Sequence, residues 1–158
     1  MKILGIDPGI ETIGFAIIEN QSAGQSLLEC GVIKTSSQDL VAKRLQDIHQ
    51  DLTQILKRHQ DIVLAGVEEL FFAKNTKTAC NVWQARGLIL FTLQEFGLTI
   101  KDIKPNEVKM AVTGSGRADK KEMQKMIQLR FGLDQPPQPD DAADAAAIAI
   151  TAAAFKLS

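Results

Sequence analysis

The segment from Asp141 to Ala154 constrains the fold most, because it is a helical stretch with almost no polar face. Nearly all of its residues are Ala or Ile. A helix that is apolar on every side has to be covered on every side. The chain has 158 residues, of which 45% are hydrophobic, so it can build the required core. This length predicts a single domain spanning residues 1–158.

Three short apolar segments open the chain and predict β-strands. They cover residues 2–7, 13–18 and 27–34. Pro8-Gly9 separates the first two, and the polar stretch 20–26 separates the second from the third. Short strands joined by tight turns pair in antiparallel fashion. We therefore expect an antiparallel meander at the start of the sheet.

The next segments alternate between helix and strand. Ser36 and Asp39 resemble a capping box, and the helix that follows carries an apolar stripe made of Leu45, Ile48, Leu52, Ile55 and Leu56. Residues 62–67 are continuously apolar, which is typical of a buried central strand, and this strand ends at Glu68.

The second half of the chain continues this alternation. Residues 76–96 predict a long helix with a stripe formed by Val82, Ile89, Leu93 and Phe96; Trp83, Leu90 and Ala79 give it a second apolar side. Such a helix is either deeply buried or shared with a partner chain. A strand over 98–103 and short helices over 106–112 and 119–131 precede the alanine-rich helix. The fold class is therefore α/β, a mixed sheet with helices on both faces.

Composition and charge exclude several classes of protein. Eighteen basic and nineteen acidic residues give a net charge of −1, which excludes a uniformly basic nucleic-acid coat protein and an acidic disordered chain. No apolar run reaches the roughly 18 residues of a membrane span, and the first residues do not resemble a signal peptide. Cys30 and Cys80 are interpreted as reduced core thiols of a cytoplasmic protein. His49 and His59 are expected at the surface, which argues against a histidine base.

Charge is unevenly distributed along the chain. Residues 101–130 carry eight basic and four acidic side chains, whereas the first 70 residues carry six basic and ten acidic ones. A basic middle region suggests an anionic partner. Solvated helix faces would give the same pattern, so this observation alone does not decide between the two interpretations.

Four carboxylates occupy unusual places. Asp7 ends an apolar strand, Glu68 ends the buried strand, and Asp141 and Asp144 share one face at the start of the alanine-rich helix. Taken singly, Asp7 could initiate a turn, Glu68 could mark an exit into solvent, and Asp141 could cap its helix. Asp144 lies one turn inside an apolar helix, where a charge requires a partner or a metal ion. Functional residues collect beyond the carboxyl ends of strands, so we expect all four to form one site.

This carboxylate set predicts a metal-dependent reaction. Four clustered carboxylates repel one another, and some stay protonated unless cations neutralise them. Oxygen ligands without Cys or His favour Mg²⁺ or Mn²⁺ over zinc. Two such ions about 3.5–4 Å apart can activate a water and stabilise the leaving oxygen of a phosphodiester. We therefore expect two Mg²⁺ per subunit, with Mn²⁺ as a substitute.

Several neighbouring residues have the chemistry to contact nucleic acid. Phe71 and Phe72 follow Glu68 closely and could include a wedge that stacks on a base, although both could equally belong to the core. Basic side chains that could hold phosphates occur next to Phe72 and around the glycine loop 114–116; they are Lys74, Lys109, Arg117, Lys120 and Lys121. A solvated charge run is the alternative interpretation.

Four segments together resemble a known family. They are Gly5-Ile6-Asp7-Pro8-Gly9, Glu68-Glu69-Leu70-Phe71-Phe72-Ala73-Lys74-Asn75, Gln84-Ala85-Arg86-Gly87 and Asp140-Asp141-Ala142-Ala143-Asp144-Ala145. In this order they resemble RuvC, the bacterial Holliday junction endonuclease, over roughly residues 2–155. The first segment alone is weak evidence for this family, whereas the four segments together are specific for it.

The resemblance implies a fold, an activity and roles for individual residues. The fold is RNase H-like, with a mixed five-stranded sheet of three antiparallel and then two parallel strands. Asp7, Glu68, Asp141 and Asp144 match the catalytic acids, Phe71 the aromatic residue that contacts bases, and Lys109 and Lys120 the functional lysines. The family nicks two strands of like polarity in a four-way DNA junction and leaves 5′-phosphate and 3′-hydroxyl ends. It forms homodimers, here through helix 76–96, and works with the branch-migration proteins RuvA and RuvB.

The chain departs from the family pattern, and other functions remain possible. Glu69 adjoins Glu68 where many relatives carry an uncharged residue. A junction-binding protein that does not cut, a nuclease acting on RNA or on other branched DNA, and an actin-like phosphate-binding fold are the alternatives. The actin-like reading fits poorly, because such proteins are much longer. Nicking of a synthetic junction would separate the first two from a resolvase.

Overall fold

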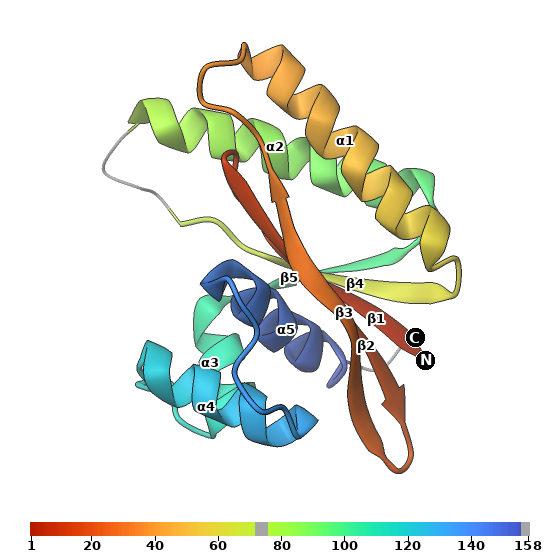
Figure 1. Cartoon of the computed structure of the whole chain (residues 1–158), viewed down its shortest axis with the longest axis vertical. Helices are drawn as coiled ribbons and strands as arrows, with labels where there is room; N and C mark the ends of the chain where they lie inside the picture. The colour runs from red at the N-terminus through yellow and green to blue at the C-terminus, as the bar shows by residue number, and fades with distance from the viewer. Residues whose placement is uncertain (72–75, 156–158) are drawn as a thin grey trace.

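The computed structural model describes residues 1–71 and 76–155, and its centre is a mixed five-stranded sheet (Figure 1). The spatial order of the strands is β3-β2-β1-β4-β5. Their bounds are Lys2–Asp7 for β1, Thr12–Gln21 for β2, Gly24–Lys34 for β3, Ile62–Glu68 for β4 and Thr99–Ile103 for β5. The first three strands pair antiparallel, and β4 and β5 run parallel to β1. The expected sheet of three antiparallel and two parallel strands is confirmed.

Helices cover both faces of this sheet. Helices α1 (Val41–Arg58) and α2 (Thr76–Glu95) lie on one face (Figure 1). Helices α3 (Pro105–Thr113), α4 (Lys120–Phe131) and α5 (Asp140–Ala152) lie on the other. Because side chains alternate along a strand, β1 contributes Ile3 to the core beneath α5 and Leu4 to the core beneath α1 and α2. Each face of the sheet thus has its own hydrophobic core.

Helix α5 packs unusually close to the sheet. The Cα partners Gly5 and Gly66 lie side by side on β1 and β4. A Cβ atom added to Gly5 would lie 2.1 Å from the Ala145 carbonyl oxygen, and one added to Gly66 would lie 2.8 Å from the Ala152 Cβ. The backbone of α5 therefore rests on Gly5, and the side chains of Ala152 and Ile148 rest on Gly66. This contact explains the alanine-rich sequence, because larger side chains would hold the helix away from the sheet.

The start of α1 differs from the expectation. Ser36 and Asp39 do not form a capping box, because the helix begins at Val41 with Leu40 as its N-cap residue. The Ser36 hydroxyl instead accepts a hydrogen bond from the Gln38 backbone N–H at 3.2 Å, in the turn that precedes the helix. The apolar stripe is confirmed: Ile48 and Leu52 are buried, as are the two residues at its end.

Several single-residue expectations were also wrong. Cys80 is exposed rather than a core thiol, whereas Cys30 is half-buried against the core beneath α5. The two histidines are half-buried rather than on the surface. Phe96 leaves the buried stripe and is 38% exposed, because α2 ends at Glu95 and Gly97 turns the chain at a φ of +70°. Within the described ranges, no helix has both the length and the apolar character to cross a bilayer.

Candidate active site

The register of the sheet places Asp7 and Glu68 next to each other. Gly5 on β1 is opposite Gly66 on β4, and two residues further along each strand come Asp7 and Glu68. Because side chains repeat every second residue, both carboxylates project from the face that the two glycines share, toward α5. The strands are parallel, so both end at the same edge of the sheet. The expected convergence of Asp7 and Glu68 follows from this pairing.

The start of α5 brings the other two carboxylates to the same edge. Gly14 is the β2 partner of Asp7, and a Cβ atom on Gly14 would lie 2.0 Å from the Asp141 carbonyl oxygen. The first turn of α5 thus lies directly over Gly14 of β2, beside the end of β1. Asp144 follows three residues later on the same side of the helix. Close glycine–helix packing therefore fixes the height at which these carboxylates stand above the sheet.

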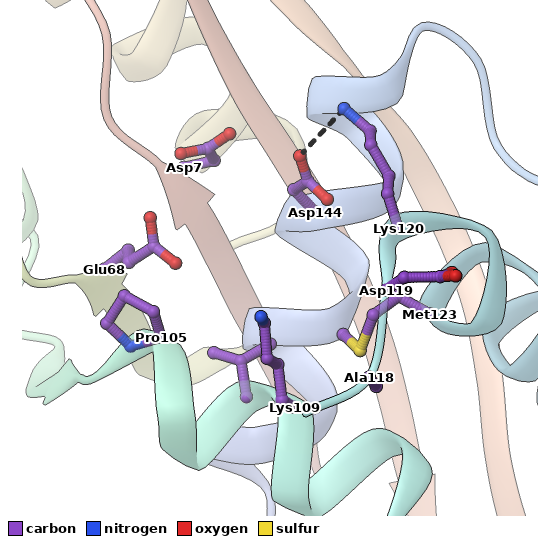
Figure 2. A pocket seen from close by; sticks show the side chains of 10 residues that line it. Asp7, Glu68, Pro105, Lys109, Ala118, Asp119, Lys120, Met123 and Asp144 are labelled. Atoms are coloured by element: carbon purple, nitrogen blue, oxygen red, sulfur yellow. Dashed lines mark ion pairs between the residues drawn. The ribbon is translucent and has the colours of Figure 1, made fainter. Parts of the chain in front are cut away.

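Three of the four carboxylates line one pocket of about 290 Å³, which Figure 2 shows from close by. Asp7, Glu68 and Asp144 turn toward the same hollow, and Lys109 and Lys120 reach into it from α3 and α4. Pro105, Val108, Ala118, Asp119 and Met123 complete the lining. Asp141 does not line it, although its charge acts on three residues that do, Asp7, Lys120 and Asp144.

Burial and mutual repulsion raise the pKa values of these carboxyl groups. The pKa of Asp7 is raised to about 8, first by burial and then by the charges of Glu68, Asp144 and Asp141. Burial and the charge of Asp144 raise the pKa of Glu68 to about 6. Burial also raises the pKa of Asp144, although Lys120 opposes this. Without a cation, the pocket therefore retains protons that isolated carboxylates would lose.

Lys120 pairs with carboxylates at the start of α5. Its Nζ lies 2.9 Å from an oxygen of Asp140 and 3.9 Å from an oxygen of Asp144 (Figure 2 marks the latter pair). The hydrogen bond to Asp140 is the main cause that raises the pKa of Lys120. Gln124 donates a further hydrogen bond to Asp140 at 2.8 Å. Asp140 thus holds Lys120 at the mouth of the pocket.

The donor set of the pocket fits a hard divalent cation. All converging acidic ligands are carboxylate oxygens, which Mg²⁺ and Mn²⁺ prefer. Burial first, and then the charges of Glu68, Asp144 and Asp141, raise the pKa of Asp7, and a bound cation would offset both effects. As the side chains stand, no three of the acidic, His or Cys residues in the described part of the chain are arranged to hold one ion. Binding would therefore draw the carboxylates closer together.

Comparisons with known proteins identify the family. A family model described as "Crossover junction endodeoxyribonuclease RuvC" matches residues 3–152. The chain belongs to the RuvC family. A RuvC of Synechococcus sp. (strain WH7803) is 42% identical, over 96% of this chain and 97% of the relative. A RuvC of Heliobacterium modesticaldum is 44% identical, over 97% and 94%.

Solved structures agree with this assignment. The structure titled "T. thermophilus RuvC in complex with Holliday junction substrate" superposes with a TM-score of 0.88 at 33% identity, covering 97% of this chain and 93% of that one. The yeast mitochondrial Holliday junction resolvase Ydc2 has a TM-score of 0.67 at 13% identity, covering 94% of this chain and 76% of that one. The latter likeness supports the fold alone.

The residues that the sequence suggested for DNA contact, from their chemistry or from the family resemblance, lie in different places. Phe71 is 63% exposed, so it is not a core residue. Lys121 lines a second hollow between α3 and α4, which adjoins the first at Ala118. Arg117 is exposed and lines neither hollow. Lys74 and Phe72 lie outside the described residues.

Two further residues of this RuvC-family site were not found from the sequence. Asp140 pairs with Lys120, which lies twenty positions earlier in the chain. Arg86 on α2 donates a hydrogen bond to the backbone of Glu68. No local pattern indicates either contact. The only signal was that both residues fall within segments that carried the family resemblance.

Proposed function

We propose that this chain is a Holliday junction resolvase, a metal-dependent endonuclease that makes symmetric nicks in a four-way DNA junction. The convergence of Asp7, Glu68 and Asp144 on one pocket carries this proposal. Membership of the RuvC family supplies the substrate class, and the Thermus relative is named as bound to such a junction. The two nicks would fall on strands of like polarity and leave 5′-phosphate and 3′-hydroxyl ends.

The four carboxylates would form the metal-binding centre. Asp7, Glu68 and Asp144 would offer oxygens directly into the pocket, and Asp141 would turn in from the first turn of α5. Two Mg²⁺ ions, with Mn²⁺ as a substitute, would activate the attacking water and stabilise the departing 3′ oxygen. The high pKa of Asp7 makes proton release accompany cation binding, so the pocket would be best occupied in neutral or alkaline solution.

Basic and aromatic side chains would position the DNA. Lys109 and Lys120 reach the pocket and would hold the scissile phosphate or stabilise the charge that develops on it. Phe71 is exposed and would stack on a base close to the crossover. Lys74, Arg117 and Lys121 are proposed to contact phosphates further along the arms.

The symmetry of the substrate calls for a symmetric enzyme. In a four-way junction, strands of like polarity form pairs related by twofold symmetry, so two sites related by a twofold axis would match one such pair. On α2, Trp83 is 44% exposed and Phe91 is 59% exposed. Gly87 lies between them at helical spacing, and a Cβ atom there would meet nothing within 4 Å. We place the homodimer interface on this face of α2.

Family membership also suggests the setting in which the enzyme works. The relatives are bacterial RuvC proteins. We therefore propose a cytoplasmic location and cooperation with RuvA and RuvB, which would move the junction while this enzyme cuts it. Co-sedimentation of the chain with a RuvA–RuvB–junction complex would test this partnership.

A nicking assay tests the proposed activity directly. End-labelled four-way junction, linear duplex and RNA–DNA hybrid are incubated with the protein, with and without Mg²⁺, and resolved on denaturing gels. We expect paired nicks in the junction alone, only with Mg²⁺. Asp7→Asn should bind the junction as the wild type does and cut it at least about a thousandfold more slowly. Binding without cutting by the wild type would indicate a scaffold, and cutting of the hybrid would indicate a ribonuclease.

A further inference from the structure

Arg86 is one of two arginines that the structure buries. Only 8% of its surface is exposed, and 7% of that of Arg44. A buried guanidinium is costly unless its charge and its N–H groups are satisfied. Arg86 belongs to the segment Gln84-Ala85-Arg86-Gly87, which carried part of the family resemblance but has no role in the function proposed above. Its burial therefore calls for an explanation.

The partners of Arg86 are the end of β4 and the neighbouring strand β5. Its Nε donates a hydrogen bond to the Glu68 carbonyl oxygen at 3.0 Å. Its terminal nitrogen forms an ion pair with the carboxylate of Asp102. Asp102 is the β5 partner of Val67, the residue before Glu68. One side chain of α2 thus clamps both strands at the edge where the pocket lies.

Glu68 needs such a clamp because the sheet holds it on one side only. The pairing of β1 with β4 ends at Ile6 and Val67, one residue before Glu68. On the other side β5 continues, and the N–H of Glu69 donates to the Ile103 carbonyl oxygen at 2.9 Å. The carbonyl of Glu68 is held by Arg86 while its carboxylate turns into the pocket (Figure 2).

We propose that Arg86 is a positioning residue, which fixes the direction in which the Glu68 carboxylate enters the pocket. It acts on the backbone from the opposite face of the sheet. A small displacement of a positioned group can cost about a hundredfold in rate. The proposal rests on the function proposed above. It also links α2, the helix of the proposed dimer interface, to the metal-binding centre.

The test compares Arg86→Gln, Arg86→Lys and Asp102→Asn with the wild type. We expect Arg86→Gln to reduce kcat for junction cleavage about ten- to a hundredfold. Its half-saturating Mg²⁺ concentration should rise several-fold, and its Kd for the junction without metal should stay within about twofold of the wild-type value. Arg86→Lys keeps the positive charge but loses the planar guanidinium group that contacts both strands. It should therefore recover part of kcat. Asp102→Asn should lower kcat and raise the half-saturating Mg²⁺ concentration as well, each by a smaller factor.

Calorimetric titration of Mg²⁺ gives a readout that does not need activity. We expect weaker Mg²⁺ binding to Arg86→Gln than to the wild type. Arg58→Gln is the control, because it removes another arginine–carboxylate ion pair, the one with Glu29, and should change neither Mg²⁺ affinity nor kcat. If Arg86→Gln does not fold, Asp102→Asn carries the test.

Specific outcomes would overturn the role of Arg86. Unchanged kcat and Mg²⁺ affinity in a folded Arg86→Gln would do so. A parallel loss of junction binding and cleavage would instead make Arg86 a DNA contact. A wild type that binds Mg²⁺ more tightly than Arg86→Gln but leaves every junction intact would refute the proposed function and keep the positioning role.

Discussion

At the scale of single residues, the protons held by the acidic pocket link stability to pH. The pKa of Asp7 rises from 3.8 to about 8 on folding, and that of Glu68 from 4.5 to about 6. Between these values the folded state binds more protons than the unfolded state. The free energy of unfolding therefore falls as pH rises through this window. The stability that protonation contributes is present in full below the unfolded pKa values and is lost as pH rises through the folded values, about 6 for Glu68 and about 8 for Asp7.

This linkage predicts how the metal-free protein melts. In EDTA, Tm should fall between pH 6 and pH 8, where Asp7 is the main contributor. The free energy of unfolding should fall there by at most about 1.4 kcal/mol per pH unit for one proton. Asp7→Asn should flatten the slope, because the amide does not titrate. Millimolar Mg²⁺ should raise Tm most at pH 8, since it binds the native state in competition with protons. Asp134→Asn, an exposed carboxyl outside the pocket, serves as the control. An equal slope in Asp7→Asn would show that other groups cause it.

The exposure of Phe71 makes a second residue-scale prediction. A side chain that stacks on a base at the crossover should matter more for the opened, reacting junction than for initial binding. Phe71→Ala should therefore lower the cleavage rate about tenfold and change the junction Kd by about twofold or less. Leu129→Ala removes a similarly exposed apolar side chain, 60% against 63%, and should leave both unchanged. Wild-type cleavage by Phe71→Ala would leave that side chain without a role in the reaction.

At the scale of secondary-structure elements, the contact between α5 and the sheet sets the geometry of the centre. Gly5→Ala places a methyl group 2.1 Å from the Ala145 carbonyl oxygen, far inside van der Waals contact. The helix has to move outward, and overpacking of this kind costs about 1–3 kcal/mol. Cleavage should fall as well, because α5 carries Asp141 and Asp144. Urea unfolding and the nicking assay measure the two effects. Gly116→Ala, with no atom within 4 Å of its added Cβ, should leave stability nearly unchanged.

The elements also show what the sequence could and could not predict. Periodicity and composition predicted that strands end at Asp7 and Glu68 and that the alanine-rich helix is buried. These features depend on the local pattern of the sequence. The false capping box at Ser36 arose because a serine hydroxyl can close a turn as readily as it caps a helix. The pairs Lys120–Asp140 and Arg86–Asp102 were missed, because only the folded chain brings their partners together. The carboxylates could be named from the sequence, but not the residues that orient them.

At the scale of the whole molecule, the exposed face of α2 gives the proposed dimer its test. A carboxylate buried at a twofold interface faces its own copy, so one substitution introduces two repelling charges. Phe91→Glu should convert a dimer into a monomer in analytical ultracentrifugation while Tm of the monomeric fold stays high, because Phe91 is 59% exposed within the chain. Leu129→Glu, at 60% exposure on α4, should remain dimeric.

Loss of the dimer should also change the pattern of cutting. The described lining of the pocket comes from one chain, so we expect a monomer to retain the chemistry of a single nick. It loses the partner that holds the second, symmetric strand in place, and the two nicks should then occur independently. On a supercoiled cruciform plasmid, the wild type should yield linear product directly, whereas Phe91→Glu should accumulate nicked circles. Direct linear product from a monomeric Phe91→Glu would show that pairing of the nicks does not depend on this face of α2.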